Sequence, residues 1–273
     1  MIDATTELYG VIGNPVRHSL SPVFHNRALR RMGRNALYLA FEVVDLEKAL
    51  SGVRGLGIRG LSVTIPFKAE VIGLLDEVEE LSKKMKAVNT IVNRGGKLIG
   101  YNTDGWGAVA ALEKVLSLEG KKAMILGAGG AARAIAYALK ERGVEIIIGN
   151  RSIDRGRGLA EELNCGFKPL SSIEEVDGDL LVNATSVGME PHGTETPLPR
   201  VRFKRRMTVM DIVYRPLRTR LLHDARRSGC RVIDGLQMLA YQGAKQLELW
   251  TGKRPEVAQI RRDLLWALRR LSR

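Results

Sequence analysis

Apolar runs of strand length alternate along the chain with stretches in which apolar residues have helical spacing. In the first part of the chain, this pattern predicts strands at residues 8–12, 37–41, 61–64, 88–92 and 98–101. It predicts helices at residues 22–32 and 46–53, a helix after Pro66, and one that Asp104 caps and that runs to about residue 118. The turn Asn93-Arg94-Gly95-Gly96 joins the last two strands and predicts a hairpin.

A second series of the same kind begins at Lys121. Its strands are expected at residues 123–126, 145–148, 180–182, 208–212 and 231–233, with helices between them. After Gly235 the pattern is helical, at residues 238–249 and 256–271. Strands that alternate with helices favour α/β architecture with largely parallel sheets.

Composition limits the class of protein. A length of 273 residues suits one large or two ordinary domains, and 45% hydrophobic with 27% charged residues is typical of globular proteins. The only two cysteines, Cys165 and Cys230, form no CxxC motif, so neither a disulfide framework nor a zinc site is expected. No apolar run approaches 18 residues, and the N-terminus lacks the features of a signal peptide. We therefore expect a cytoplasmic protein without membrane contact.

The net charge of +13 favours anionic partners. The longest basic cluster is only Lys204-Arg205-Arg206, and the other cations are scattered among acids, so no stripe for nucleic acid is evident. A small phosphorylated cofactor needs only a few well-placed cations. No nucleic-acid partner is therefore expected.

A phosphate-binding turn follows the first strand of the second series. Residues 127–132 read G-x-G-x-x-A between an apolar strand and a helix, with another strand about 20 residues on. Gly127 permits the tight turn, Gly129 lets the backbone approach a pyrophosphate, and Ala132 lets helix and strand pack closely. The helix N-terminus supplies N–H donors to the anion. This pattern predicts a dinucleotide site.

The next strand ends in Asn150, followed by Arg151, Ser152 and Arg155. An NAD site commonly has Asp or Glu at this position, for the ribose 2′-hydroxyl. A carboxylate would repel a 2′-phosphate, whereas a guanidinium binds it through charge-assisted hydrogen bonds. These residues favour NADP over NAD.

Polar residues of the first series gather where its strands end. They are Ser19, Ser21, Thr64, Lys68, Asn89, Thr90, Asn102, Thr103 and Asp104. Open α/β sheets bind ligands at the carboxyl ends of their strands, so these side chains are expected to line one pocket for a small hydroxylated acid. Taken singly, Ser21 and Asp104 also fit as helix caps. His18 and His25 lack metal-ligand neighbours, so no metal site is expected.

The assembled motifs resemble shikimate dehydrogenase in order and spacing over nearly the whole chain. The most specific motifs are Ser19-Leu20-Ser21-Pro22 and Val63-Thr64-Ile65-Pro66-Phe67-Lys68. The others are Ala87-Val88-Asn89-Thr90, Asn102-Thr103-Asp104-Gly105, Gly127-Ala128-Gly129-Gly130-Ala131, Asn150-Arg151-Ser152, Asn183-Ala184-Thr185-Ser186, Asp211-Ile212-Val213-Tyr214-Arg215-Pro216 and Gly235-Leu236-Gln237-Met238-Leu239-Ala240-Tyr241-Gln242.

The resemblance implies reversible, NADPH-dependent reduction of 3-dehydroshikimate to shikimate, in the route to chorismate and the aromatic amino acids. By motif, Ser19 and Ser21 would bind the substrate carboxylate with Tyr214 close by, and Thr64, Asn89, Asp104 and Gln242 would hold the ring hydroxyls. Lys68 would be the catalytic acid/base, paired with Asp104. Around NADP(H) would lie Gly127, Ala128, Gly129, Gly130, Ala131, Asn150, Arg151, Ser152, Arg155, Thr185, Ile212, Gly235, Met238 and Glu80.

The resemblance also implies the domain organisation. We predict two α/β domains flanking a cleft: a mixed-sheet substrate domain, residues 1–103 plus 237–273, and a Rossmann-type NADP-binding domain, residues 104–236. The chain is expected to be a monomer or homodimer. The alternatives are a quinate/shikimate dehydrogenase with broader substrate and NAD use, a cofactor-binding regulator without catalysis, and a nucleic-acid binder.

Overall fold

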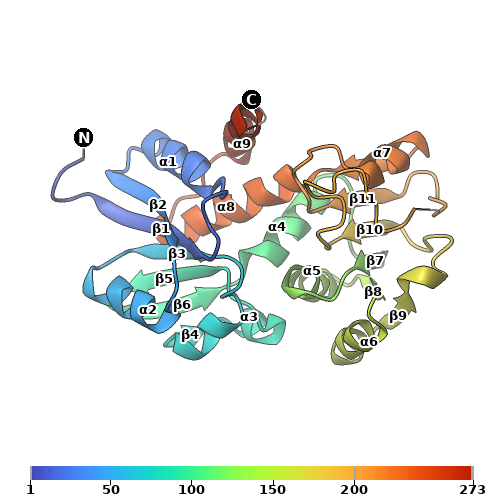
Figure 1. Cartoon of the computed structure of the whole chain (residues 1–273), viewed down its shortest axis with the longest axis horizontal. Coiled ribbons are helices and arrows are strands. Elements are labelled where there is room, and N and C mark those ends of the chain that lie inside the picture. Colours follow the sequence, from blue (N-terminus) through green and yellow to red (C-terminus); the bar gives the residue numbers. More distant parts are fainter. Residues whose placement is uncertain (1, 200, 272–273) are drawn as a thin grey trace. The chain divides into compact units, whose positions relative to one another are not determined.

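The computed structural model describes residues 2–199 and 201–271, and it divides into two compact units. The first unit comprises Met1–Thr103 with Ala240–Arg273, and the second comprises Asp104–Leu239. The chain returns to the first unit within a single helix, α8 (Gly235–Thr251) (Figure 1). In the described residues each unit contains one six-stranded sheet.

The sheet of the first unit is mixed. Its strands are β1 (Glu7–Gly13), β2 (Ala36–Glu42), β3 (Gly60–Val63), β4 (Glu77–Val78), β5 (Thr90–Arg94) and β6 (Lys97–Tyr101), in the order β2-β1-β3-β5-β6-β4. β1 is parallel to β2 and β3, whereas β5 is antiparallel to both β3 and β6. β5 and β6 form the predicted hairpin, and Asn93 Oδ1 accepts a bond from the Gly96 N–H in its turn.

The two faces of this sheet have different roles. Leu61 and Val63 of β3 join the apolar core that includes Leu50 and Val53 of α2 (Leu46–Gly55). Because strand residues alternate between faces, Gly60 and Ser62 point the other way, toward α8. A Cβ at Gly60 would collide with the indole of Trp250, so glycine is required for this close approach. One face is thus an apolar core, and the other carries buried polar side chains.

A local capping signal sets the start of α2 in the first unit. The side chain of Asp45 caps α2 by accepting a bond from the Lys48 N–H, and the helix buries Leu46, Leu50 and Val53. The first unit also contains α1 (Ser21–Arg31), α3 (Glu80–Met85) and α9 (Val257–Leu271). None of the helices in the described part of the chain has the length and apolar character needed to cross a bilayer.

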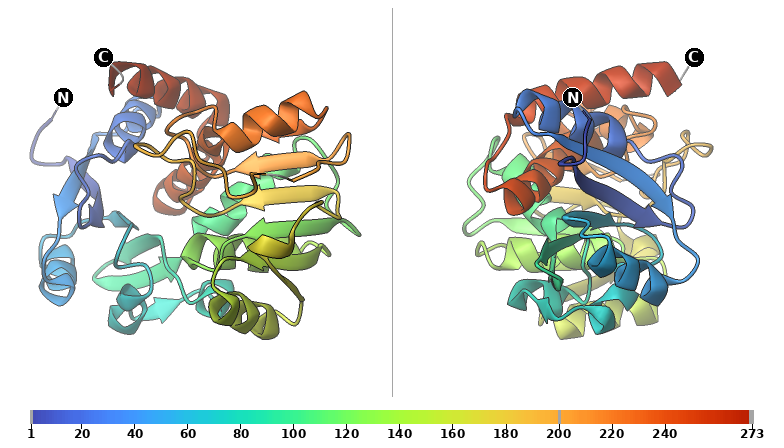
Figure 2. Two further views of the ribbon diagram at one scale, coloured as in Figure 1. Left: turned by 45° about the vertical axis from the view of Figure 1, so that its right-hand side comes forward. Right: turned by 90° about the vertical axis from the view of Figure 1, so that its left-hand side faces the viewer.

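The sheet of the second unit is entirely parallel, and its strands lie side by side in Figure 2. They are β7 (Lys122–Leu126), β8 (Glu145–Asn150), β9 (Gly166–Pro169), β10 (Leu180–Asn183), β11 (Thr208–Asp211) and β12 (Arg231–Ile233), in the order β12-β11-β10-β7-β8-β9. Its helices are α4 (Thr103–Leu112), α5 (Gly130–Lys140), α6 (Ile153–Glu162) and α7 (Arg220–Arg227). The strand order reverses at β7, where doubly wound sheets bind ligands. The predicted pairing of a mixed-sheet with a Rossmann-type domain is confirmed.

Two predicted helices are wrong in extent, and the helix expected between β10 and β11 does not occur in the described residues 184–199 and 201–207. The helix expected after Pro66 is instead a 3₁₀ helix (Glu70–Leu74), the short strand β4 and then α3. The helix expected to reach residue 118 ends at Leu112, and its first turn already contains Asp104, which therefore is not the cap. Leu118 is buried although it lies outside the helix, which explains why the apolar pattern continues past its end.

Candidate active site

The polar segments of the first unit meet at one edge of its sheet. β1 and β3 run parallel, so Gly13 and Val63 end together, and the Thr64 N–H donates to Ile12 O at 3.0 Å. β5 runs the opposite way, so Asn89, which precedes it, lies at the same edge. Asn89 joins both neighbours there: its O accepts from the Val63 N–H at 2.8 Å, and its N–H donates to Tyr101 O at 3.0 Å.

The serine loop leads into the N-terminus of α1. Ser19 Oγ accepts a bond from the Ser21 N–H at 3.2 Å, and both serines are half-buried. The N-cap residue, Leu20, has no side-chain hydrogen bond to the first turn. An 11-residue helix therefore starts beside two hydroxyls, which together suit an anionic group.

Lys68 lies in a tight segment after β3. The Phe67 N–H donates to Thr64 O at 3.0 Å, and the Val88 N–H donates to Lys68 O at 2.7 Å. The ring of Phe67 is buried in the apolar core of the first unit. These contacts fix the backbone of Lys68 next to the segment that leads to Asn89.

Asn89 is the centre of a buried hydrogen-bond cluster. Its Oδ1 accepts from the Thr103 N–H at 2.8 Å, and its Nδ2 donates to Thr103 Oγ1 at 3.0 Å. Gln242 Oε1 completes the cluster, at 3.4 Å from Asn89 Nδ2 and 3.3 Å from Thr103 Oγ1. Three residues far apart in the sequence, Asn89, Thr103 and Gln242, thus lie close together. Thr103 directly precedes Asp104 in the chain.

The glycine turn of the second unit has the geometry of an anion site. Gly127 has φ of +113°, a conformation that disfavours any side chain, and its N–H donates to Gly149 O at 2.8 Å. Gly129 is the N-cap of α5 and forms no side-chain cap. A Cβ added to Gly129 or Gly130 would meet nothing within 4 Å, and both residues are exposed. The start of α5 is therefore open to a pyrophosphate.

The strand next to this turn ends beside a second helix N-terminus. Asn150 Nδ2 donates to Ser152 O at 2.8 Å, and Ser152 is the N-cap of α6 without a side-chain cap bond. The side chains of Arg151, Ser152 and Arg155 are exposed. A hydroxyl, two guanidinium groups and the dipole of α6 thus favour an additional anionic group here.

A buried carboxylate ties β10 to β11. Asp211 Oδ1 accepts from Asn183 Nδ2 at 2.9 Å and from the Val213 N–H at 3.0 Å, and its Oδ2 accepts from Thr219 Oγ1 at 2.7 Å. Desolvation raises the pKa of Asp211 to about 6, although these hydrogen bonds oppose the shift. Asn183 Oδ1 also accepts from Thr185 Oγ1 at 2.7 Å. The segments that carry Thr185 and Ile212 are held by this network.

The comparisons with known proteins agree over most of the chain. Three family models match: "Shikimate dehydrogenase substrate binding domain" at residues 11–91, "Shikimate / quinate 5-dehydrogenase" at 109–213, and "Shikimate 5'-dehydrogenase C-terminal domain" at 235–265. The shikimate dehydrogenase (NADP(+)) of Pyrococcus abyssi is 50% identical over 258 residues, which cover 94% of this chain and 96% of that protein. The chain belongs to the shikimate dehydrogenase family.

Other members of the shikimate dehydrogenase family are similarly close. The enzyme named shikimate dehydrogenase (NADP(+)) in Thermococcus kodakarensis is 48% identical, over 96% of this chain and 97% of that protein. The crystal structure of the Thermus thermophilus enzyme in complex with NADP(H) and shikimate has a TM-score of 0.90 and 39% identity, covering 96% of this chain and 99% of that one. The family resemblance predicted from the sequence is confirmed.

The structure distributes the predicted family residues between the units. Ser19, Ser21, Thr64, Lys68, Asn89 and Gln242 belong to the first unit, and Asp104 and Tyr214 to the second. Burial raises the pKa of Tyr214, so its hydroxyl remains a hydrogen-bond donor at neutral pH. The predicted cofactor residues all belong to the second unit, with the exception of Glu80.

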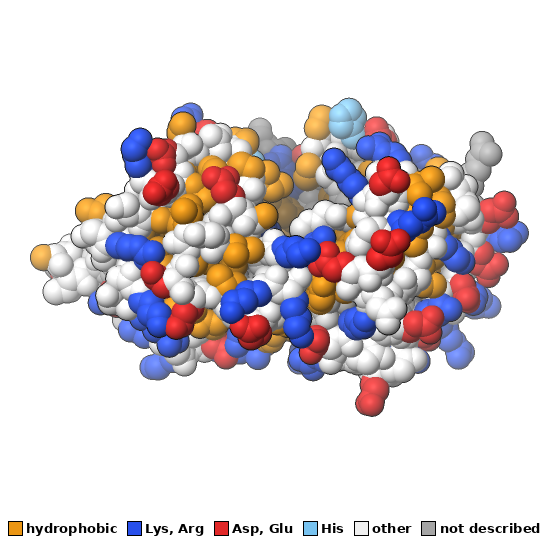
Figure 3. Space-filling model, turned by 90° about the horizontal axis from the view of Figure 1, so that it is seen from below, with side chains coloured by type: hydrophobic (Ala, Val, Ile, Leu, Met, Phe, Trp, Pro, Cys, Tyr) orange, Lys and Arg blue, Asp and Glu red, His pale blue; other side chains and the backbone are white. Residues whose placement is uncertain are grey.

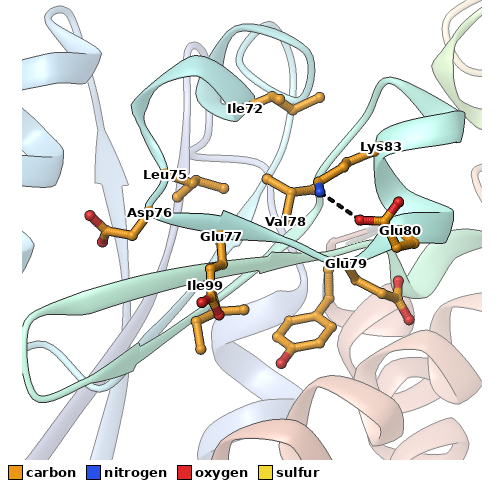
Figure 4. Close-up of a pocket in the computed structure, with 10 residues that line it drawn as sticks. Ile72, Leu75, Asp76, Glu77, Val78, Glu79, Glu80, Lys83 and Ile99 are labelled. Atoms are coloured by element: carbon orange, nitrogen blue, oxygen red, sulfur yellow. Dashed lines mark hydrogen bonds and ion pairs between the residues drawn. The ribbon is translucent and has the colours of Figure 1, made fainter.

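Glu80 lies on α3, where its side chain is exposed and pairs with Lys83 at 2.6 Å. Both residues line a cavity of about 720 Å³ between β4, α3 and the 3₁₀ helix (Figure 4). Its walls are acidic and apolar, and Tyr101 also lines it. None of the predicted substrate residues lines this cavity.

Sequence reasoning expected Thr103 in the pocket without a specific role and did not single out Gln246, and both belong to the buried polar cluster of the first unit. A signal was present for Gln246. It follows Gln242 by one helical turn, and two glutamines at this spacing share one face of α8, where apolar residues would be expected.

Proposed function

We propose that the chain catalyses the reversible, NADPH-dependent reduction of 3-dehydroshikimate to shikimate, in the biosynthesis of chorismate and the aromatic amino acids. The observation that carries this proposal is the cluster of Asn89, Thr103 and Gln242 at the sheet edge that also bears Thr64 and Lys68. Amide and hydroxyl groups in this arrangement suit a small molecule with several ring hydroxyls. The Thermus thermophilus relative, crystallised with NADP(H) and shikimate, supports the same substrate here.

Each polar group has a proposed role toward this substrate. Ser19 and Ser21, at the N-terminus of α1, bind its carboxylate, with Tyr214 as a further donor. Thr64, Asn89, Asp104 and Gln242 hold the ring hydroxyls. The roles of Asn89 and Gln242 are supported by the hydrogen bond between their side chains, because this bond orients both amides before the substrate binds.

The residues of the second unit fit a phosphorylated dinucleotide. The turn from Gly127 to Ala131 and the open N-terminus of α5 suit its pyrophosphate, because no side chain fills that space. Asn150, Arg151, Ser152 and Arg155 suit a 2′-phosphate. Thr185, Ile212, Gly235 and Met238 follow the ends of β10, β11 and β12, and they would lie along the cofactor, with Glu80 of the first unit as a further neighbour. The bound NADP(H) supplies or accepts the hydride.

Lys68 is proposed as the acid/base. When the ketone is reduced, negative charge develops on its oxygen, and the Lys68 ammonium donates a proton to that oxygen; in the reverse direction the amine accepts it. Asp104 binds the same hydroxyl and orients the ammonium. Asp104 directly follows Thr103 in the chain, and the Thr103 N–H donates to Asn89 Oδ1 at 2.8 Å. This hydrogen bond fixes the position of the backbone from which the Asp104 side chain extends.

The partners proposed for the chain are its small-molecule substrate and NADP(H), with no nucleic acid and no membrane. On the face shown in Figure 3, Lys and Arg side chains alternate with Asp and Glu instead of forming a stripe. Within the longest basic cluster, Lys204 pairs with Asp177 at 2.6 Å. The cysteines, Cys165 and Cys230, are free thiols, as suits a cytoplasmic enzyme. We propose a monomer or homodimer.

An absorbance assay of reduced nicotinamide, with shikimate or quinate crossed against NADP or NAD, tests the function. We expect turnover with shikimate and NADP to exceed the other three pairs. The preference for NADP is expected because Asn150 stands where NAD sites commonly have an acidic residue, and Arg151 and Ser152 follow it. Preference for quinate and NAD would favour the broader quinate/shikimate dehydrogenase. No turnover with any pair would reject both.

A further inference from the structure

Gln246 links the substrate cluster to the buried polar face of the sheet. It lies on α8 with 2% of its surface exposed. Its Oε1 accepts a hydrogen bond from Ser62 Oγ at 3.0 Å, and its Nε2 donates to Thr90 Oγ1 at 3.0 Å and to Asn89 O at 3.2 Å. Both ends of this amide are therefore used.

Hydroxyl protons run in one direction through this network. Tyr38 donates to Ser62 Oγ at 2.6 Å, and Ser62 then donates its own proton to Gln246. Thr90 Oγ1 accepts from Gln246, so its single proton is available to Asn89 Oδ1, which lies at 2.8 Å. Thr103 Oγ1, at 3.3 Å from Thr90 Oγ1, is the poorer acceptor.

The direction of these bonds determines which way the Asn89 amide points. Its Oδ1 accepts from Thr90 Oγ1 and from the Thr103 N–H, both at 2.8 Å. The Nδ2 group must then face Thr103 Oγ1 and Gln242 Oε1. If Gln246 did not donate, the Thr90 hydroxyl could accept a bond instead of donating to Asn89 Oδ1, and Thr103 alone would then hold the amide in this orientation.

We propose that Gln246 is a positioning residue of the substrate site. It acts through Thr90 to keep the Nδ2 donor of Asn89 on the side of Thr103 Oγ1 and Gln242 Oε1, where the substrate is expected to bind. This inference rests on the proposed function, since it assumes that Asn89 binds a ring hydroxyl of shikimate. Gln246 itself has no role in contacting substrate. Its effect is on how tightly shikimate binds and not on the hydride or proton step.

The test is a double-mutant cycle of Gln246→Met and Asn89→Ala, read as KM for shikimate, KM for NADP and kcat. Met keeps the length of the side chain and removes both donors. We expect Gln246→Met to raise KM for shikimate about fivefold to tenfold, the effect of roughly one hydrogen bond, and to change KM for NADP and kcat by less than about twofold. In the Asn89→Ala background the same change should alter KM for shikimate by less than about twofold.

Trp250→Phe is the matched control. Trp250 lies one turn further along α8 and donates from Nε1 to Ile91 O at 2.9 Å. Its replacement therefore removes a half-buried donor of the same helix that does not bond to the Asn89 cluster. We expect it to lower stability without changing KM for shikimate. If Gln246→Met folds poorly, Thr90→Val tests the same link, because it removes the hydroxyl and keeps the β-branched shape that suits a strand.

Two results would overturn the inference. One is an unchanged KM for shikimate in a folded Gln246→Met or Thr90→Val protein. The other is that Gln246→Met raises KM for shikimate equally in the wild type and in the Asn89→Ala variant. A wild-type protein that neither binds nor oxidises shikimate would instead reject the proposed function, and this inference with it. Turnover by the wild-type protein separates the two cases.

Discussion

Lys68 is the residue on which the proposed chemistry depends most. Lys68→Ala removes the proton donor but leaves the dinucleotide turn untouched, so we expect kcat to fall by about 10² to 10⁴ while NADPH affinity is retained. Steady-state kinetics and fluorescence titration with NADPH measure the two effects. Lys97→Ala is the control, because Lys97 is an exposed lysine of the same sheet that pairs with Glu77 at 2.5 Å. Near-normal turnover of Lys68→Ala would remove Lys68 from the catalytic role.

We expect Arg151 to decide between the two nicotinamide cofactors. If its guanidinium binds the 2′-phosphate, Arg151→Ala should raise KM for NADPH about tenfold and leave KM for NADH nearly unchanged, since NADH lacks that phosphate. Kinetics with both cofactors provide the measurement. Arg157 is an exposed arginine on α6, the helix that follows Arg151, and Arg157→Ala should affect neither KM. Equal effects of Arg151→Ala on both cofactors would show that Arg151 acts only through the general positive charge.

At the level of single elements, pattern alone predicted strands and helices with strong periodicity. β1, α2 and β7 agree with their apolar runs, and the glycine turn after β7 followed from the strand and helix around it. Short elements were missed. β4 has two residues, and β9 has alternate exposed positions, so neither carries an apolar run of strand length. Such strands exist because a neighbouring strand pairs with them, which the local sequence does not record.

The ends of β10 and β11 depend on one ionisable group. Asp211 has a folded pKa of about 6 against 3.8 for the ordinary group, so the folded state retains its proton to higher pH. Its contribution to stability is then full below about pH 3.8 and is lost as the pH rises through about 6, by roughly 3 kcal/mol. Asp211→Asn should remove this pH dependence from the β10 and β11 amides in hydrogen exchange between pH 4 and 7.

Asp177→Asn is the control for Asp211, because its carboxylate is exposed and pairs with Lys204, which lowers the pKa of Asp177. It should leave the exchange profile of β10 and β11 as in the wild type. Asp211→Asn should also raise KM for NADP, since the segment carrying Thr185 loses part of its support. A wild-type profile that is flat between pH 4 and 7 would contradict the role given to Asp211.

At the scale of the whole molecule, the candidate site shows where sequence reasoning ends. The polar residues were found because each follows or precedes a strand, and parallel order brings strand ends together. The hydrogen bonds that these residues form with one another were not predicted. The bonds from Asn89 to Gln242 and from Gln246 to Thr90 join segments separated by 153 and 156 positions. Which amide faces which hydroxyl depends on the docking of α8 on the sheet, and no local pattern specifies that.

The two units should respond to acid in opposite ways. His25 is fully buried in the first unit, its ring stacks on Tyr38 at 4.1 Å, and its Nδ1 donates to Ser21 O at 3.0 Å. Desolvation lowers the pKa of His25 to about 3, so the unfolded chain binds a proton near pH 6.5 that the folded chain does not. Stability from this group is therefore present above pH 6.5 and is lost as the pH falls toward 3, by on the order of 5 kcal/mol.

Asp211 has the opposite sign in the second unit, which gains stability as the pH falls from about 6 to 3.8. We therefore expect the first unit to open before the second on acidification, as measured by hydrogen exchange of α1 and β2 against β10 and β11 between pH 6.5 and 4. His25→Phe keeps a flat ring against Tyr38 and cannot titrate, so it should shift the opening of the first unit to lower pH and leave the second unit unchanged. If the wild type and His25→Phe open at the same pH, burial of a neutral His25 does not control the acid stability of the first unit.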